Sequence, residues 1–280
     1  MSLRFTKMHG LGNDFAVLDA RTQSFPGDPA LIRRMGDRQR GIGFDQLLTL
    51  HAPMRRDCVA SWRIWNRDGT RAEQCGNGLR CVAAWLARAG EIAFGEEAWL
   101  EGAEVSGVRV HALDDIEVDL GEPCFGAEAT GCSGAAEAGS CVLRIDNAPL
   151  RCVLVSMGNP HAVVEVADLS APALERLGPA LTTHASFAHG VNAGFAQVLD
   201  RTCVRLRVHE RGAGWTAACG SGAAAAMAAL RLGGRVDAET AVALPGGVLR
   251  LHWPGPGHAL HMRGPAAFVY EGEWLDDSRA

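Results

Sequence analysis

The sequence predicts an α+β fold of two pseudo-symmetric domains, each a mostly antiparallel sheet wrapped around a central helix. Two observations lead to this prediction. Many short apolar runs of strand length surround one long helical pattern in each half of the chain. The two halves also share an unusual set of residues at a constant spacing, which indicates an internal duplication. At 280 residues, the chain has room for two domains with ample cores.

The first half carries six runs that are typical of strands because they are rich in apolar and β-branched residues. These runs cover residues 3–8, 15–19, 46–51, 58–65, 108–113 and 116–120. Pro29 favours the first turn of a short helix that continues to about residue 38. A longer amphipathic pattern, closed by Gly90, predicts a helix from about Gly78 to Ala89.

The second half repeats this organisation after a weakly patterned stretch, Gly121–Ser140, which is either a domain boundary or a long connection. Its runs of strand type cover residues 152–157, 161–166, 193–199, 203–209, 248–253, 259–263 and 267–270. An alanine-rich pattern predicts the second long helix from about Gly222 to Leu232.

Shifting the sequence by 144 residues (207 − 63) places several residues of the first half on identical residues of the second. The matched pairs are Arg63/Arg207, Arg67/Arg211, Cys75/Cys219, Gly76/Gly220, Gly78/Gly222, Ala84/Ala228, Leu86/Leu230 and Gly90/Gly234. Chance could explain the alanine, leucine and last glycine pairs in a chain this rich in those residues. The upstream arginine with the Cys-Gly-x-Gly motif is much less common, so we favour two homologous domains that face each other.

The composition argues against several classes of protein. With 48% apolar and 21% charged residues the chain has a globular profile, and a net charge of −5 offers no basic surface for nucleic acid. The longest uncharged apolar run, Ala223–Leu230, is far shorter than the roughly 20 residues of a membrane span. The N-terminal segment is charged where a signal peptide would be apolar. We therefore expect a cytoplasmic protein with neither a nucleic-acid nor a membrane partner.

The numbers and spacing of cysteine and lysine residues limit which metal sites and cofactors the protein can have. Nine cysteines, an odd number, suit a reducing compartment, and the absence of Cys-x-x-Cys makes a zinc ribbon or thioredoxin-like site unlikely, so we predict no metal. Lys7 is the only lysine among 27 basic residues. Because pyridoxal phosphate needs a lysine for its Schiff base, that cofactor is not expected. The segment from Gly220 to Ala225 fits a dinucleotide fingerprint but lacks the preceding strand, so we predict no cofactor.

The duplicated element consists of a cysteine, a Gly-polar-Gly segment and a helix. It reads QCGNGLRCVAAWLARAG in the first half and ACGSGAAAAMAALRLGG in the second. A thiol at a helix N-terminus lies near unpaired N–H groups and the positive end of the helix dipole, which favour the thiolate. The glycines allow an anion such as a carboxylate to approach the backbone closely. Cys75 and Cys219 are therefore candidate catalytic thiols, whereas the other seven cysteines are expected to be small apolar residues.

Two opposed thiols of this kind can invert a stereocentre. One thiolate removes a proton from one face of a carbon while the other thiol donates a proton to the opposite face. The adjacent carboxylate would bind at the two helix N-termini, whose N–H groups stabilise the developing charge. A redox dithiol with the cysteines close in sequence is the competing interpretation, but these two are 144 residues apart (219 − 75). If the sulfurs face each other, oxidation could join them and block substrate.

Several motifs in register resemble those of the diaminopimelate epimerase family and cover nearly the whole chain. They are KMHGLGNDF (7–15), GIGFDQLL (41–48), QCGNGLRC (74–81), SMGNPHAVV (156–164), GVNAGF (190–195), ERGAG (210–214), ACGSGA (218–223), LPGG (244–247) and GHALHMRGPAAFVYEG (257–272). The resemblance implies an isomerase that works without pyridoxal phosphate and interconverts LL- and meso-2,6-diaminoheptanedioate in lysine and peptidoglycan precursor biosynthesis.

The same resemblance implies a homodimer with diaminopimelate as its small-molecule substrate and an active site between two domains. Because the last strand of the family returns to the first domain, we expect domains over residues 1–119 plus 265–280 and over 120–264. It assigns the acid–base pair to Cys75 and Cys219, and the tuning of the thiols to His161 and Glu210. It assigns substrate binding to Asn13, Gln46, Asn66, Gly76, Asn77, Asn159, Asn192, Glu210, Arg211, Gly220 and Ser221.

Some alternatives stay open. Asn13, Asn66, Asn159 and Asn192 lie beside turn residues, where a lone asparagine is usually a turn former, and His161 could be a satisfied strand histidine. Trp215 stands where the family usually has an acidic residue. It either alters access to Cys219 or is an exposed or interface aromatic residue.

The function also has competitors. A proline racemase or hydroxyproline epimerase shares the fold family, and a catalytically silent binding protein would share the fold. Glu210, Arg211 and the asparagines suit a substrate with a second amino-acid end and favour diaminopimelate.

Overall fold

The fold is that of a computed structural model, which describes residues 2–72, 75–134, 136–137 and 139–275. The chain forms two compact units: unit 1 comprises Met1–Val118 and Gly264–Ala280, and unit 2 comprises Asp119–Arg263. The Gly/Ala-rich stretch 121–140, in which we expected a boundary or a long connection, belongs to unit 2. It contains two short strands and a short helix.

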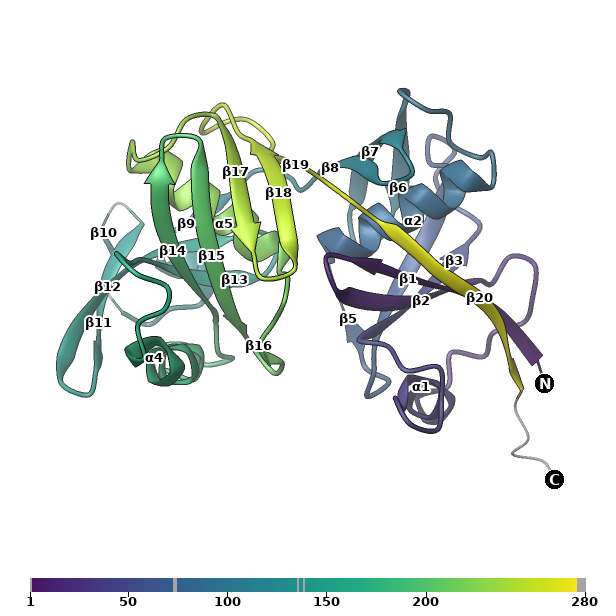
Figure 1. Ribbon diagram of the computed structural model, residues 1–280, viewed down its shortest axis with the longest axis horizontal. Coiled ribbons are helices and arrows are strands. Elements are labelled where there is room, and N and C mark those ends of the chain that lie inside the picture. The colour runs from purple at the N-terminus through teal and green to yellow at the C-terminus, as the bar shows by residue number, and fades with distance from the viewer. Residues whose placement is uncertain (1, 73–74, 135, 138, 276–280) are drawn as a thin grey trace. The chain divides into compact units, whose positions relative to one another are not determined.

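Within the described residues, unit 1 contains eight strands from the first part of the chain and one strand from its end. Its elements are β1 (Ser2–Gly10), β2 (Asn13–Asp19), α1 (Pro29–Gly36), β3 (Gln46–His51), β4 (Ala60–Asn66), β5 (Arg71–Ala72), α2 (Gly76–Arg88), β6 (Glu97–Glu101), β7 (Val105–Ala112), β8 (Asp115–Asp119) and β20 (Ala267–Leu275). Figure 1 shows β20 in yellow beside β1 in purple, and the two strands pair antiparallel. The end of the chain therefore returns to the first unit.

Unit 2 follows the same plan. Its elements are β9 (Cys124–Phe125), α3 (Ala127–Thr130), β10 (Ala136–Glu137), β11 (Ser140–Ile145), β12 (Ala148–Ser156), β13 (Pro160–Glu165), α4 (Ala173–Thr182), β14 (Asn192–Asp200), β15 (Cys203–Glu210), β16 (Gly214–Trp215), α5 (Gly220–Leu232), β17 (Glu239–Leu244), β18 (Gly247–His252) and β19 (His261–Gly264).

The strand pairing confirms the predicted duplication and the largely antiparallel sheets. In unit 1, β1–β2 and β3–β4 pair antiparallel, β2–β3 and β4–β6 pair parallel, and β6–β7–β8 form an antiparallel meander. In unit 2 the same sequence of pairings joins β12, β13, β14, β15, β17, β18 and β19. Each unit also has one more strand that pairs antiparallel with the first strand of this order. This strand is β20 beside β1 in unit 1 and β11 beside β12 in unit 2.

A central helix lies against the sheet in each unit, as predicted. α2 packs against β1, β2, β3 and β7, and α5 packs against strands from β12 to β18. The two helices begin 144 residues apart (220 − 76) and have the same length of 13 residues. Each is followed by a glycine with positive φ, Gly90 at 79° and Gly234 at 68°. This left-handed conformation ends the helix and explains why glycine stands at both positions.

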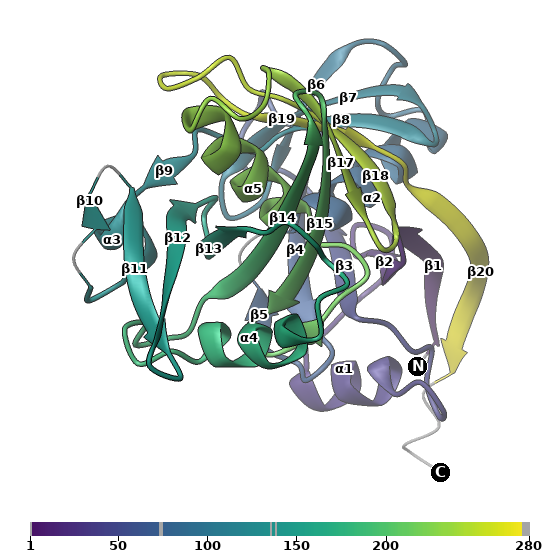
Figure 2. The same cartoon turned by 60° about the vertical axis from the view of Figure 1, so that its left-hand side comes forward.

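A third duplicated element was not predicted from the sequence. α4 lies outside the sheet of unit 2 and packs against β11, β14, β15 and β16 (Figure 2), and it begins 144 residues after α1 (173 − 29). Pro179 lies inside this helix, where it removes one backbone hydrogen bond. A buried apolar face that includes Leu174 and Leu181 compensates through packing into the core of unit 2.

None of the helices within the described residues is both long and apolar enough to cross a membrane.

Candidate active site

Cys75 and Cys219 occupy equivalent positions at the N-termini of the two central helices. Each is the residue that caps its helix and has an extended backbone, with φ/ψ of −153°/101° for Cys75 and −122°/106° for Cys219. The Cys75 Sγ accepts a hydrogen bond from the N–H of Gly78 at 3.3 Å, and the Cys219 Sγ accepts one from Gly222 at 3.4 Å. Both sulfurs therefore receive a helix N–H group that favours negative charge on them.

The second glycine of each Cys-Gly-x-Gly motif is required by space. A Cβ at Gly222 would lie 2.9 Å from Cγ2 of Val208 and 3.1 Å from the Cys219 Sγ. A Cβ at Gly78 would lie 3.2 Å from Cδ2 of Leu48. A larger residue at position 222 would force Val208 or the sulfur to shift, whereas one at position 78 would require Leu48 to move by a few tenths of an ångström, so the motif helps to fix the thiol position.

Three predicted residues of unit 1 lie at strand ends, and one of them contacts Cys75. Asn13 begins β2, and its Nδ2 donates to the Cys75 Sγ at 3.9 Å. Gln46 begins β3 and donates to Oδ1 of Asn66, the last residue of β4, at 3.0 Å. The Oε1 of Gln46 is buried and has no hydrogen-bond partner among the described residues. It is therefore an acceptor available to a donor group of a ligand.

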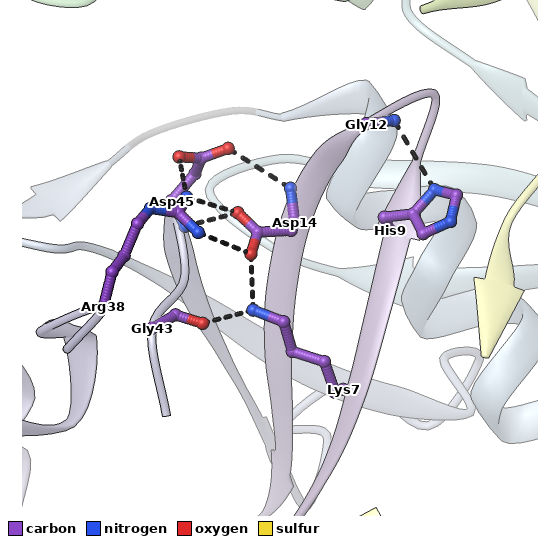
Figure 3. Close-up of polar contacts among 7 residues, drawn as sticks. All are labelled: Lys7, His9, Gly12, Asp14, Arg38, Gly43 and Asp45. Atoms are coloured by element: carbon purple, nitrogen blue, oxygen red, sulfur yellow. Dashed lines mark hydrogen bonds and ion pairs between the residues drawn. The ribbon is translucent and has the colours of Figure 1, made fainter. Parts of the chain in front are cut away.

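Asn13 and Asn66 also have the turn role that we left open. Asn13 follows a tight turn in which Leu11 and Gly12 both have positive φ, at 55° and 88°. The Gly12 N–H donates to His9 across this turn (Figure 3). Asn66 donates through Nδ2 to Thr70 in the next turn at 3.0 Å. The turns thus fix where both amides lie.

An ion-pair network holds these strand ends from the other face of the sheet (Figure 3). The Asp14 carboxylate accepts from Lys7 of β1, from both terminal nitrogens of Arg38 at 2.7 and 3.0 Å, and from the Asp45 N–H at 3.0 Å. Lys7 also donates to the Gly43 carbonyl. Burial alone would raise the pKa of Asp14, but hydrogen bonds from Arg38 and Lys7 outweigh it and hold that pKa well below its usual range.

Successive side chains of β2 point to opposite faces of the strand, so the Asp14 network and the Cys75 thiol lie on different sides of β2. Ala16 and Leu18 share a face with Asp14 and pack in the same core cluster as Leu31 and Ile32 of α1. Asn13 lies on the opposite face, where it reaches Cys75. Asp14 directly follows Asn13 in the chain, and Asp45 directly precedes Gln46. The network thus fixes the backbone from which Asn13 and Gln46 project.

In unit 2, three predicted side chains form a closed hydrogen-bonded group. Asn159 donates to the Ser221 Oγ at 3.2 Å, and Nε2 of His161 lies 3.0 Å from the Asn159 Oδ1 and 3.1 Å from the Ser221 Oγ. Because Oδ1 can only accept, Nε2 carries the proton with Asn159 in this orientation. The other ring nitrogen, Nδ1, is buried with no partner in the described part of the chain. His161 is thus not a fully satisfied strand histidine.

His161 reaches the thiol through Ser221. The Ser221 Oγ lies 3.7 Å from the Cys219 Sγ. Burial, helped by the charge of Arg211, lowers the pKa of His161 to about 3, so its ring is neutral near pH 7. A neutral ring can orient Ser221 without adding a charge beside the sulfur.

Burial raises the pKa of Cys219 well above its ordinary value, and the negative charge of Glu210 raises it further. Hydrogen bonds from Ser221 and Gly222 act in the opposite direction. Glu210 ends β15 and accepts a hydrogen bond from the Thr216 hydroxyl at 2.5 Å. Cys219 is therefore a protonated thiol in this environment, ready to donate a proton.

A hydrogen bond connects the side chain of Asn192 to the backbone of Arg211. The Asn192 Oδ1 accepts from the Arg211 N–H at 2.9 Å, and its Nδ2 donates to the Pro160 carbonyl at 3.2 Å. The Arg211 guanidinium donates to the His189 carbonyl at 3.0 Å. This contact uses one of the guanidinium's N–H groups, so others can take a carboxylate.

Trp215 packs within its own unit. Its ring centroid lies 5.8 Å from that of Phe195 and 5.3 Å from that of His209, and the Arg207 guanidinium lies 4.2 Å from the ring. A Cβ at Gly178 would approach the ring to 2.6 Å. Trp215 is therefore partly buried and not exposed, whereas an effect of this side chain on access to Cys219 stays a prediction.

The predicted site residues thus form two groups, one in each unit. The first thiol site consists of Asn13, Gln46, Asn66, Cys75, Gly76 and Asn77. The second thiol site consists of Asn159, His161, Asn192, Glu210, Arg211, Cys219, Gly220 and Ser221. Gln74, which opens the first motif, lies outside the described residues.

Comparison with known proteins decides the family. The family model described as diaminopimelate epimerase matches residues 5–122 and 153–269. The chain belongs to the diaminopimelate epimerase family. It is 49% identical over 275 residues to a diaminopimelate epimerase of Xylella fastidiosa (strain M12), covering 97% of this chain and 96% of that protein. It is also 49% identical over 278 residues to one of Xanthomonas axonopodis pv. citri (strain 306), with the same coverage.

This family membership confirms the sequence resemblance. Solved structures share the fold at much lower identity. A hydroxyproline epimerase from Agrobacterium vitis with bound trans-4-hydroxy-L-proline aligns with a TM-score of 0.71 and 17% identity, covering 99% of this chain and 93% of that one. A probable proline racemase from Agrobacterium radiobacter K84 aligns with a TM-score of 0.72 and 16% identity, covering 99% and 94%. These similarities confirm the predicted fold class.

Sequence reasoning missed two charged features beside the first thiol site. One is the network of Lys7, Asp14 and Arg38, and the other is the buried Arg80 on α2. For the network a signal was present, because the only lysine of the chain lies in the same motif as Asn13 and Asp14. Its partner Arg38 is 24 residues from Asp14, and only the fold brings the two together.

Proposed function

We propose that this family member interconverts LL- and meso-2,6-diaminoheptanedioate by proton transfer between two thiols, Cys75 and Cys219, in lysine and peptidoglycan precursor biosynthesis. The observation that carries the proposal is the matched pair of helix-capping cysteines, each with its sulfur held by the N–H of the glycine three residues later. If the two cysteines only filled space in the core, packing would not require a helix-capping sulfur at the equivalent position of both units.

In this reaction one sulfur is a thiolate and the other a thiol. The thiolate takes the proton from the α-carbon, and the electron pair of the broken C–H bond spreads onto the adjacent carboxylate. The opposite thiol then gives its proton to the other face of the carbon and becomes the thiolate. N–H groups in the first turns of α2 and α5, at Gly76, Asn77, Gly220 and Ser221, bind the carboxylate as its negative charge grows.

The remaining polar groups suit a substrate with a second amino-acid end. The buried Oε1 of Gln46 can accept from an ammonium group, and the carboxylate of Glu210 can pair with one. Arg211 can bind a distal carboxylate through its free N–H groups, and Asn13, Asn66, Asn159 and Asn192 donate and accept without adding charge. Proline or hydroxyproline has no such second end and would leave these groups unmatched.

The only lysine of the chain is engaged elsewhere. Lys7 Nζ is paired with Asp14 and the Gly43 carbonyl, and the side chain is 10% exposed. A protonated ammonium in a buried ion pair is a poor nucleophile for a Schiff base. This supports a reaction in which the thiols alone move the protons.

We further propose a cytoplasmic homodimer, as the family resemblance implied. None of the nine cysteines, all of which are described by the structure, forms a disulfide, which suits a reducing compartment. Val269, Tyr270 and Leu275 of β20 are 54%, 47% and 63% exposed, which is unusual for large apolar side chains on one strand. Sedimentation equilibrium gives the mass in solution, and a monomer at all concentrations would contradict the dimer.

The activity is tested by following deuterium from D₂O into the α-position of LL-diaminopimelate by NMR. The parent protein should exchange and epimerise, and Cys75→Ala and Cys219→Ala should each reduce epimerisation by at least about a thousandfold. Cys124→Ala, at an exposed cysteine outside both thiol sites, is the matched control and should match the parent. Epimerisation that survives in both thiol variants contradicts the mechanism, and exchange into proline but not diaminopimelate contradicts the substrate.

A further inference from the structure

The loop that connects α4 to β14 has a fixed path where it passes Arg211. The Gly190 N–H donates to the Phe187 carbonyl at 3.0 Å, and the Val191 N–H donates to the Thr182 carbonyl, at the end of α4, at 3.1 Å. The Val191 side chain is fully buried in the core of unit 2. The last residues of the loop are therefore attached both to α4 and to the core.

This loop and the start of β14 contact Arg211 along its whole length. At the backbone, the Arg211 N–H donates to the Asn192 Oδ1 at 2.9 Å. At the far end of the side chain, Nη1 donates to the His189 carbonyl at 3.0 Å. Between these two contacts the aliphatic part lies against Gly190, where an added Cβ would come within 3.2 Å of Cδ and 3.4 Å of Cγ. The direction of the arginine is therefore set by a loop segment of four residues.

Two independent features require glycine at position 190. Its φ of 71° lies in the left-handed region, which residues with a Cβ rarely adopt. A Cβ there would also lie 3.0 Å from the Thr182 carbonyl oxygen, which already accepts from Val191. Thr182 is buried at the end of α4, so this carbonyl has little room to move. A side chain at position 190 would therefore shift the loop or displace the stem of Arg211.

The direction of Arg211 matters because its charge belongs to the second thiol site. That charge helps to lower the pKa of the buried His161, which contacts Ser221 at 3.1 Å. Within the described residues, the guanidinium has the His189 carbonyl as its hydrogen-bond acceptor, so further N–H groups can bind a carboxylate. An arginine side chain loses much rotational freedom when it binds a ligand, and holding it beforehand reduces this cost.

We propose that Gly190 is a positioning residue for substrate binding, because it lets the loop hold the Arg211 guanidinium where the distal carboxylate of the substrate binds. This inference rests on the proposed function and adds the element that holds the carboxylate ligand in place. Gly190 touches neither the substrate nor the reacting atoms. A distal contact is made equally in the bound substrate and in the transition state, so its loss should raise KM and leave kcat nearly unchanged.

The first test measures the steady-state kinetics of LL-diaminopimelate epimerisation by Gly190→Ala and Gly190→Asn. In Gly190→Ala, kcat/KM should fall by about tenfold, since the guanidinium is displaced by less than an ångström, while kcat stays within about twofold of the parent. Asparagine tolerates the left-handed conformation but still adds the Cβ, so Gly190→Asn should show the same loss. If asparagine restores the parent kinetics, only backbone strain matters and the positioning role is wrong.

Gly234→Ala is the matched control for backbone strain. Gly234 has a φ of 68°, close to that of Gly190, and a Cβ there would meet no atom within 4 Å. It follows the C-terminal end of α5, whereas Cys219 caps the other end. Folded Gly234→Ala, judged by circular dichroism, should have the kinetics of the parent protein. A fall in kcat/KM equal to that of Gly190→Ala would mean that strain in unit 2 alone causes the loss, which overturns the proposal.

A double-mutant cycle tests whether Gly190 acts through Arg211. Arg211→Ala should lower kcat/KM by about a hundredfold or more, and adding Gly190→Ala should lower it further by no more than about twofold. A further tenfold loss in the double variant would show that Gly190 acts by another route and overturns its positioning role. The proposed function fails differently, because epimerisation that survives Cys75→Ala and Cys219→Ala contradicts the two-thiol reaction whatever the cycle shows.

Discussion

The ion pair between Lys7 and Asp14 offers the sharpest test of how the first thiol site is held. The Asp14→Asn substitution keeps the shape of the side chain and removes its charge. The side chains of Lys7 and Asp14 are 10% and 17% exposed, so the lysine would keep a charge that is poorly hydrated and no longer compensated. Removing one partner of a buried pair costs about 3–5 kcal/mol.

The lower end of that range applies here. Arg38, the other cation on Asp14, is 47% exposed and can rehydrate when the carboxylate is lost. We therefore expect Asp14→Asn to lower the free energy of unfolding of unit 1 by about 3 kcal/mol. For a unit of this size the loss corresponds to a fall in melting temperature of roughly 10 °C.

Urea denaturation followed by far-UV circular dichroism measures this loss, with Asp57→Asn as the matched control. Asp57 pairs with Arg55 at 2.7 Å, but the two side chains are 59% and 55% exposed. An ion pair between exposed side chains contributes little to stability, so the control should stay close to the parent protein. Equal losses in the two variants would refute the reasoning, because burial would then make no difference.

The pH dependence gives a second check on the same pair. The pKa of Asp14 is lower in the folded protein than in the unfolded chain, so the stabilisation is fully present above the unfolded pKa, near 4. It is lost as the pH falls through the folded pKa. The difference between the parent and Asp14→Asn should therefore be constant from pH 5 to 8 and shrink below about pH 4. A difference that grows on acidification contradicts the assignment.

Three further predictions concern unit 2. Gly222→Ala should lower kcat by about tenfold or more, because its Cβ would meet Val208 and the Cys219 Sγ at 2.9 and 3.1 Å; unchanged kinetics would show that the helix start can shift freely. Trp215→Ala should lower the free energy of unfolding of unit 2 by about 3 kcal/mol in urea denaturation, since it removes a large packed aromatic ring; a loss under 1 kcal/mol contradicts that packing. The pKa of His161 is lowered to about 3, so the unfolded chain binds a proton first, and stability should fall by up to about 1.4 kcal/mol per pH unit from pH 6.5 downward. His161→Gln should flatten this slope in acid titrations of stability, and an equally steep slope would assign it to another group.

The sequence determined the fold class because the duplication is visible in patterns formed by residues that are close together in the chain. The apolar runs and the two glycine-closed helices predicted the strands and the central helices from residues that are neighbours in the chain. The Cys-Gly-x-Gly motif predicted the capping thiols for the same reason, since a helix cap involves only the residues around the helix start. The helix α4 was missed because Pro179 breaks the local pattern, and its stability comes from distant core residues.

What only the tertiary structure decided is the electrostatic environment of each thiol. Cys75 and Cys219 have nearly the same neighbours in sequence, yet a buried guanidinium lies beside one and a carboxylate acts on the other. These charges depend on burial, which arises from packing between segments far apart in the chain, such as Gly10 against Arg80. The field of a charge is set by its distance and by the exclusion of water, and neither quantity is encoded in local sequence.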